Sequence, residues 1–150
     1  MMKQFIKYAM ILLKLSLFIL VVHSVDATAE ILVIANKNAP IENISKGDLK
    51  SIYTGKLFTF PNSNQEVKPL DLTGEGTGKE NFYKAVTGKS LRKIKTYWAR
   101  QLFTGKGKPP ESQIDEETMK KTVNSGIAYI GYISAENLDD TVKVIFRIAN

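Results

Sequence analysis

The sequence predicts an α/β domain in three layers, with a mixed sheet flanked by helices. Short apolar runs rich in β-branched residues, such as Ile31–Ala35 and Val142–Ile148, have the length of buried strands. Between these runs lie segments whose apolar residues recur at the spacing of one helix face. Strands that alternate with helices are typical of this architecture. The composition of the 150 residues, 43% hydrophobic and 24% charged, fits one globular domain.

The chain begins with the pattern of a secretory signal peptide. Two lysines precede an apolar stretch over residues 10–22, and Ala27 and Ala29 supply the small residues of a cleavage site. The stretch is shorter than the about 20 residues that span a bilayer. We therefore expect residues 1–29 to be removed and residues 30–150 to form the mature domain, with an uncleaved membrane anchor as the alternative.

Missing residue types exclude several classes of site. The sequence has no cysteine, and its one histidine, His23, lies in the segment expected to be removed. Disulfides, thiol catalysis and cysteine-rich metal sites are therefore excluded. Without a thiol for a lipid anchor, an exported chain is expected to be free in the periplasm. Loss of residues 1–29 removes three lysines and one aspartate and lowers the net charge from +6 to +4.

The mature chain is expected to open with a strand, a loop and a short helix. The strand covers Ile31–Ala35, and the loop ends near Pro40. Ser45 is the predicted N-cap of the helix, and Gly55 stands where the helix ends. The apolar face of this helix is formed by Leu49, Ile52 and Tyr53.

A loop over residues 56–65 leads to a second predicted strand at 67–72. Pro69 favours an edge position or the start of that strand, because proline has no N–H to donate. A glycine-rich loop follows, and then a helix that ends at Gly88. Its predicted start is a capping box formed by Thr77 and Glu80.

The second half of the chain continues the alternation. Ser90 is the predicted cap of an amphipathic helix that ends at Gly105, and Asp115 caps another that extends to Asn124. A turn-rich loop over 105–110 separates the two helices. The first of them places Leu91, Ile94, Trp98 and Leu102 on one core-facing side. Core strands are expected at 126–132 and 142–148.

The glycine-rich loop is the candidate binding site. Glycines at alternate positions let the backbone approach a ligand, and the positive end of a helix dipole favours an oxyanion. A flexible strand-to-helix turn is the structural alternative, and the carboxylate of Glu75 would repel an anion. The predicted ligand-binding residues are Thr73, Gly74, Glu75, Gly76, Thr77, Gly78 and Lys79.

Other chemistry is less well supported. The loop lacks the glycine and hydroxyl positions of a nucleotide P-loop and the third glycine of a dinucleotide fingerprint. The acidic pairs Glu116-Glu117 and Asp139-Asp140 are typical of solvated turns. The lysines and arginines around Tyr97 and Trp98 suggest nucleic acid only if Trp98 is exposed, and its spacing predicts a core position. We therefore expect no catalytic residues, metal, cofactor or nucleic acid.

Four sequence phrases, taken together with their order and spacing along the chain, resemble the phosphate-type substrate-binding proteins of ABC transporters. The resemblance is to the short, single-lobe members in particular. One phrase is the glycine loop itself, which opens a helix containing Phe82. The others are Leu49-x-x-Ile52-Tyr53-Thr54-Gly55-Lys56, Tyr97-Trp98-Ala99-Arg100-x-x-Phe103-Thr104-Gly105 and Gly126-Ile127-Ala128-Tyr129-Ile130-Gly131-Tyr132.

The resemblance implies one lobe of a periplasmic-binding-protein type II fold. In the family, such a lobe carries an Arg-x-x-Gly-Ser-Gly-Thr loop that binds phosphate. Here the serine falls on Glu75 and the arginine near Asp71. The resemblance implies phosphate or a similar oxyanion as ligand and an ABC permease as partner. The alternative function is a protein-interaction module that has lost anion binding and docks an envelope sensor, another envelope protein or a second copy of the chain.

Overall fold

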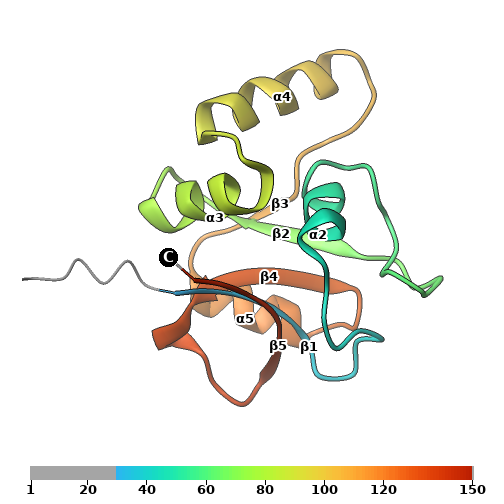
Figure 1. Ribbon diagram of the computed structural model, residues 1–150, viewed down its shortest axis with the longest axis vertical. Coiled ribbons are helices and arrows are strands. Elements are labelled where there is room, and N and C mark those ends of the chain that lie inside the picture. Colours follow the sequence, from blue (N-terminus) through green and yellow to red (C-terminus); the bar gives the residue numbers. More distant parts are fainter. Residues whose placement is uncertain (1–29, 150) are drawn as a thin grey trace, which may run out of the picture.

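The computed structural model describes residues 30–149, and five strands form one mixed sheet (Figure 1). The strand order is β3-β2-β4-β1-β5. β2 is parallel to β3 and β4, whereas β1 is antiparallel to β4 and β5. The predicted signal peptide lies outside the described residues. The strands are β1 (Ile31–Asn36), β2 (Lys68–Leu72), β3 (Glu111–Gln113), β4 (Tyr129–Ser134) and β5 (Val142–Ile148).

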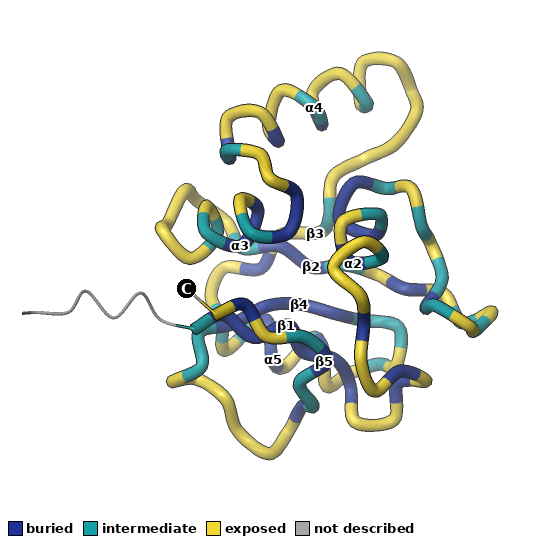
Figure 2. The backbone as a smooth tube through the Cα atoms, viewed as in Figure 1, coloured by how far each residue is buried: buried dark blue, intermediate teal, exposed yellow. Residues whose placement is uncertain are grey.

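Helices cover both faces of the sheet, which confirms the predicted layers. α5 packs on one face, against the apolar cluster that contains Leu32 and Leu70. α2 and α3 pack on the other face, and α4 lies outside α3 with much of its surface exposed (Figures 1 and 2). The helices are α2 (Lys46–Tyr53), α3 (Thr77–Thr87), α4 (Leu91–Phe103) and α5 (Glu116–Asn124), with a short 3-10 helix η1 (Ala135–Asn137).

The predicted helix caps are correct for two helices and wrong for α3. The side chains of Ser45 and Asp115 accept hydrogen bonds from backbone N–H groups in the first turns of α2 and α5. Ser90 precedes α4, but its hydroxyl caps no N–H group. α3 begins one residue earlier than predicted, because the extended Gly76 is its N-cap and Thr77 is already helical. The Thr77–Glu80 capping box therefore does not form.

The strand predictions need two corrections, whereas the position of Pro69 is as predicted. Pro69 lies at the start of β2, an inner strand, and fits there because β2 pairs with β3 only from Leu70 onward. β3 was not predicted, since its three polar residues carry no hydrophobic alternation. The strand predicted at 126–132 instead covers 129–134, after a turn.

The buried face of α4 is shorter than its periodicity predicts. Trp98 is buried, with 7% of its surface exposed, as expected for a core residue. Leu102 is 55% exposed, so its predicted core position is wrong. The last turn of α4 lies beyond the helices that it packs on, and Phe103 at its end is exposed as well. No helix of the described residues is long and apolar enough to cross a bilayer.

Gly131 allows α5 to pack closely on β4. A Cβ atom added to Gly131 would lie 2.3 Å from Met119 Sδ and 3.4 Å from a Val123 methyl carbon. We expect Gly131→Ala to lower the free energy of unfolding by about 1–3 kcal/mol through overpacking. Gly78→Ala is the control, because nothing lies within 4 Å of its added Cβ. Urea denaturation that finds equal stability for both variants would contradict this packing.

Candidate functional site

The glycine-rich loop lies between the carboxyl end of β2 and the start of α3. Thr73 anchors its first residue, since its N–H donates to Gln113 O at 2.8 Å and its hydroxyl to Ile114 O at 3.3 Å. Gly74 has a φ of 77°, a left-handed conformation that favours glycine. Added Cβ atoms at Gly74, Gly76 and Gly78 would meet nothing within 4 Å. The loop is therefore open to solvent along its glycines.

α3 begins with free backbone donors. Its N-cap is a glycine, and no side chain caps its first turn. The first backbone hydrogen bond to Gly76 O comes from Glu80 N, at 3.2 Å. The N–H groups of Thr77, Gly78 and Lys79 therefore have no acceptor within the helix. Together with the positive end of the helix dipole, they are suited to a small anion.

Lys79 does not extend into the loop, because it is held by a buried carboxylate. Its Nζ lies 2.9 Å from Asp71 Oδ2 and donates to Leu72 O at 2.6 Å. The Tyr83 hydroxyl donates to the same Oδ2 at 2.9 Å, and the Tyr132 hydroxyl donates to Oδ1 at 2.6 Å. We call Asp71, Lys79, Tyr83 and Tyr132 the Asp71 cluster. The Lys79 charge is thus paired beneath the loop.

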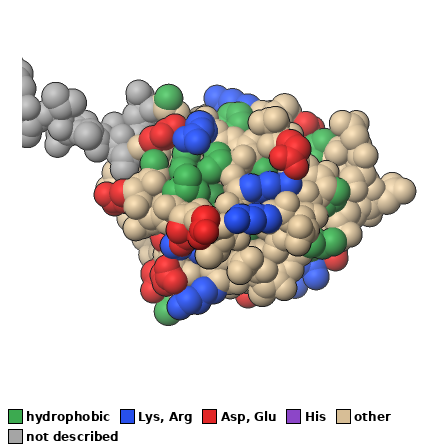
Figure 3. All heavy atoms as spheres, turned by 90° about the horizontal axis from the view of Figure 1, so that it is seen from below, with side chains coloured by type: hydrophobic (Ala, Val, Ile, Leu, Met, Phe, Trp, Pro, Cys, Tyr) green, Lys and Arg blue, Asp and Glu red, His purple; other side chains and the backbone are tan. Residues whose placement is uncertain are grey.

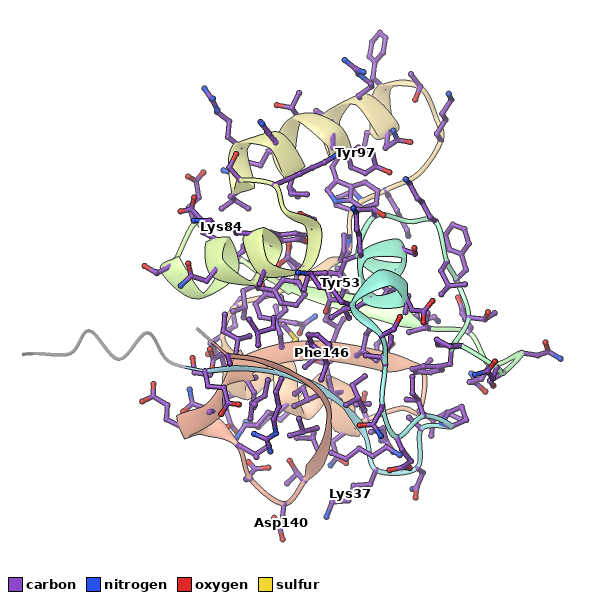
Figure 4. The ribbon with its side chains drawn as sticks, viewed as in Figure 1. Lys37, Tyr53, Lys84, Tyr97, Asp140 and Phe146 are labelled. Carbon is purple, nitrogen blue, oxygen red and sulfur yellow. The ribbon has the colours of Figure 1, made fainter. Side chains whose placement is uncertain are left out.

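Aromatic rings enclose the Asp71 cluster. Phe82 stacks on Tyr132 with ring centroids 3.9 Å apart, and Tyr53 meets Phe82 edge to face at 4.7 Å. Tyr53 points from α2 toward the sheet (Figure 4), and its hydroxyl donates to Leu70 O at 3.0 Å. Burial, followed by the charge of Asp71, raises the pKa of Tyr53, Tyr83 and Tyr132 well above the usual value. All three phenols remain neutral donors at physiological pH.

Glu75 is also paired. Its carboxylate forms an exposed ion pair with Lys95 of α4. Exposed pairs exchange with solvent and stabilise little, so Glu75 remains a negative group at the mouth of the loop. Of the seven predicted residues, Lys79 is thus turned toward the protein interior, whereas residues 73–78 are exposed.

Three residues of the two acidic pairs, Glu116, Glu117 and Asp139, have structural partners. Glu116 accepts hydrogen bonds from Ser134, and Lys120 contacts Glu117 at 3.1 Å and Asp139 at 2.5 Å. The hydrogen bond from Lys120 lowers the pKa of Asp139. Residues 30–149 contain no cluster of three or more side chains suited to a metal. On the face away from α4, basic and acidic side chains are interspersed (Figure 3).

Comparisons with known proteins identify the fold. Comparisons with protein-family models and with curated proteins find no match. Among solved structures, an ABC-type phosphate transport receptor from Vibrio cholerae superposes with a TM-score of 0.61 at 19% identity. A Clostridium perfringens protein solved with bound phosphate scores 0.60 at 22%, and PstS from Borrelia burgdorferi scores 0.59 at 11%. This is the fold of the phosphate-type substrate-binding proteins.

The similarity covers only part of those receptors. It includes 78% of this chain but 46%, 45% and 47% of the three receptor chains, in the order given above. The chain therefore spans less than half of their length. At these identities the comparison establishes the architecture only. Any role of the loop residues has to be argued from their own geometry.

Proposed function

We propose that the chain is a periplasmic solute-binding-like protein of the phosphate ABC transporter type. It binds phosphate or another oxyanion at residues 73–79 and performs no catalysis. The observation that carries this proposal is the uncapped start of α3, where three N–H groups follow an open glycine loop. The fold shared with phosphate receptors supports it. An ABC permease is the partner that this function implies.

The charges around the loop determine how such an anion is held. The Lys79 ammonium is paired with Asp71, and the Lys95 ammonium is paired with Glu75. Neither lysine is therefore an unpaired cation at the loop. Backbone N–H groups and the Thr77 hydroxyl are then the main donors. Because these donors carry no net charge, binding is expected to depend only weakly on salt concentration.

Calorimetric titration of residues 30–150 with phosphate, sulfate and molybdate tests the proposal. Glu75→Ser is expected to raise the affinity about five-fold, the effect of removing one like charge at about 4 Å in water. Absence of heat for all three anions, in the parent protein and in Glu75→Ser, would rule out a solute receptor.

Substitutions at Thr77 distinguish the contribution of the backbone N–H to anion binding from that of the side-chain hydroxyl. Gly76 has φ −64° and ψ 155°, the conformation that a residue before proline prefers. Thr77→Pro removes one N–H and the hydroxyl at a helix position that tolerates proline. Thr77→Ala, the matched control, removes the hydroxyl alone. We expect Thr77→Pro to weaken phosphate binding more than Thr77→Ala does, and equal losses would contradict a backbone site.

A protein-interaction module in the envelope is the second candidate function. The observation that favours it is the exposed apolar end of α4, where Leu102 is 55% and Phe103 is 93% exposed. An envelope sensor or a second copy of the chain would cover this end. Sedimentation velocity of the parent and of Phe103→Ser tests the second copy, and pull-down with both proteins tests a sensor. Anion titration is unaffected by Phe103→Ser if the two surfaces are independent.

A further inference from the structure

A cavity of about 530 Å³ lies beneath α4, at the opposite end of β2 from the glycine loop. Its walls come from the end of α2, the start of β2, the inner side of α4 and the loop at residues 106–110. The Tyr97 hydroxyl, on α4 (Figure 4), donates to Thr54 O at 2.7 Å and thereby ties α4 to the end of α2. Cavities of roughly 300–1,000 Å³ are typical of small-molecule sites.

The core side of the cavity is apolar, and the Trp98 side chain forms part of its wall. Ile52, Val67 and Leu70 line it from the core side. The Trp98 ring is positioned by two glycines. A Cβ atom added at Gly55 would lie 3.0 Å from Trp98 Cη2, and one added at Gly107 would lie 3.8 Å from Cζ3. This lining suits the planar, apolar body of an organic molecule.

Trp98 has an unused hydrogen-bond donor. Within residues 30–149, its indole Nε1 is the buried side-chain nitrogen or oxygen atom that lacks a partner. Buried tryptophan N–H groups usually have an acceptor, because an unpaired buried donor is destabilising. Trp98 lines the cavity with only 7% of its surface exposed. Because Nε1 itself is shielded from the cavity, the Trp98 ring presents its carbon atoms to a ligand.

The mouth of the cavity carries an excess of positive charge. Lys68, Lys106 and Lys108 line it together with Glu66 and Glu111. Lys68 pairs with Glu66 at 3.5 Å, which leaves two lysines against one glutamate. These groups are solvent-exposed and lie around the apolar interior. They therefore favour a ligand that presents a negative group to the mouth.

We infer that this cavity binds a small organic anion with a planar apolar body, such as an aromatic carboxylate or sulfonate. The apolar body lies against Trp98, and the anionic group lies near Lys106 and Lys108. This site is separate from the glycine loop and does not depend on the proposed oxyanion function. The apolar lining and the charge at the mouth both indicate the same ligand class.

Fluorescence tests this site directly, because Trp98 is the one tryptophan in the sequence. The probe is 1-anilinonaphthalene-8-sulfonate, and N-phenyl-1-naphthylamine is its neutral counterpart. We expect the sulfonate to bind one per chain and to quench Trp98 by energy transfer. The double variant K106Q/K108Q is expected to raise the dissociation constant of the sulfonate about five-fold, the effect of roughly one charge contact in water. Binding of the neutral probe is expected to stay unchanged.

Phe103→Ser is the matched control, because Phe103 is exposed at the end of α4 and does not line the cavity. Sulfonate binding that persists in this variant supports the cavity. Binding that is lost there, or that leaves Trp98 emission unchanged, overturns the inference, as does the absence of binding. Phosphate at constant ionic strength is expected not to displace the sulfonate, and displacement would also overturn a separate site.

Discussion

Replacing Lys79 by methionine is expected to lower the free energy of unfolding by about 3–5 kcal/mol, the typical cost of removing one partner of a buried ion pair. The variant leaves the Asp71 carboxylate, whose side chain is only 8% exposed, without its cation. The Tyr83 and Tyr132 hydroxyls still donate to the carboxylate, but they carry no compensating charge. Urea denaturation of the parent and the variant at neutral pH measures the difference.

Lys95→Met is the matched control at the same loop. It removes the cation of the exposed pair with Glu75, for which we expect a loss of about 0–1 kcal/mol. A double variant, Asp71→Asn with Lys79→Met, removes both charges and is expected to recover part of the stability lost in Lys79→Met. Equal losses in Lys79→Met and Lys95→Met would contradict the structural role of the buried pair.

The fold was predictable from the sequence where the signal is local. Apolar runs and caps such as Ser45 and Asp115 identify the helices and the longer strands. β3 escaped prediction because its pairing with β2, and not its own side chains, makes it a strand. Leu102 was assigned to the core because periodicity describes a helix face but not where the neighbouring helices end.

The candidate site was predictable only in part. The glycine loop stands out in the sequence, but the engagement of Lys79 does not, because Asp71, Tyr83 and Tyr132 are brought together by the tertiary fold. The sequence does contain one indication of the buried pair. Asp71 lies between Leu70 and Leu72 in a predicted strand, and a carboxylate buried there needs hydrogen-bond or ionic partners. The cavity beneath α4 has no comparable local signal, because residues from five separate parts of the chain form its walls.

The three buried tyrosines around Asp71 also predict a steep loss of stability in alkali. Burial, followed by the charge of Asp71, raises the pKa of Tyr53, Tyr83 and Tyr132 in the folded protein. In the unfolded chain a tyrosine has a pKa of about 10. Below that pH both states hold the phenolic protons, and the stability is fully present. Above it, the unfolded chain releases three protons that the folded protein keeps, so stability falls as pH rises.

Each retained proton lowers the free energy of unfolding by about 1.4 kcal/mol per pH unit above pH 10, so the three tyrosines together contribute about 4 kcal/mol per unit. Urea denaturation followed by circular dichroism between pH 8 and pH 11 measures this slope. Tyr132→Phe loses one hydrogen bond to Asp71 and is less stable at every pH. Because it also removes one of the three titrating groups, its tyrosine contribution to the slope is expected to fall by about a third. A parent protein whose stability stays constant from pH 10 to pH 11, or a Tyr132→Phe variant with an unchanged slope, would show that these phenols are not buried against the carboxylate.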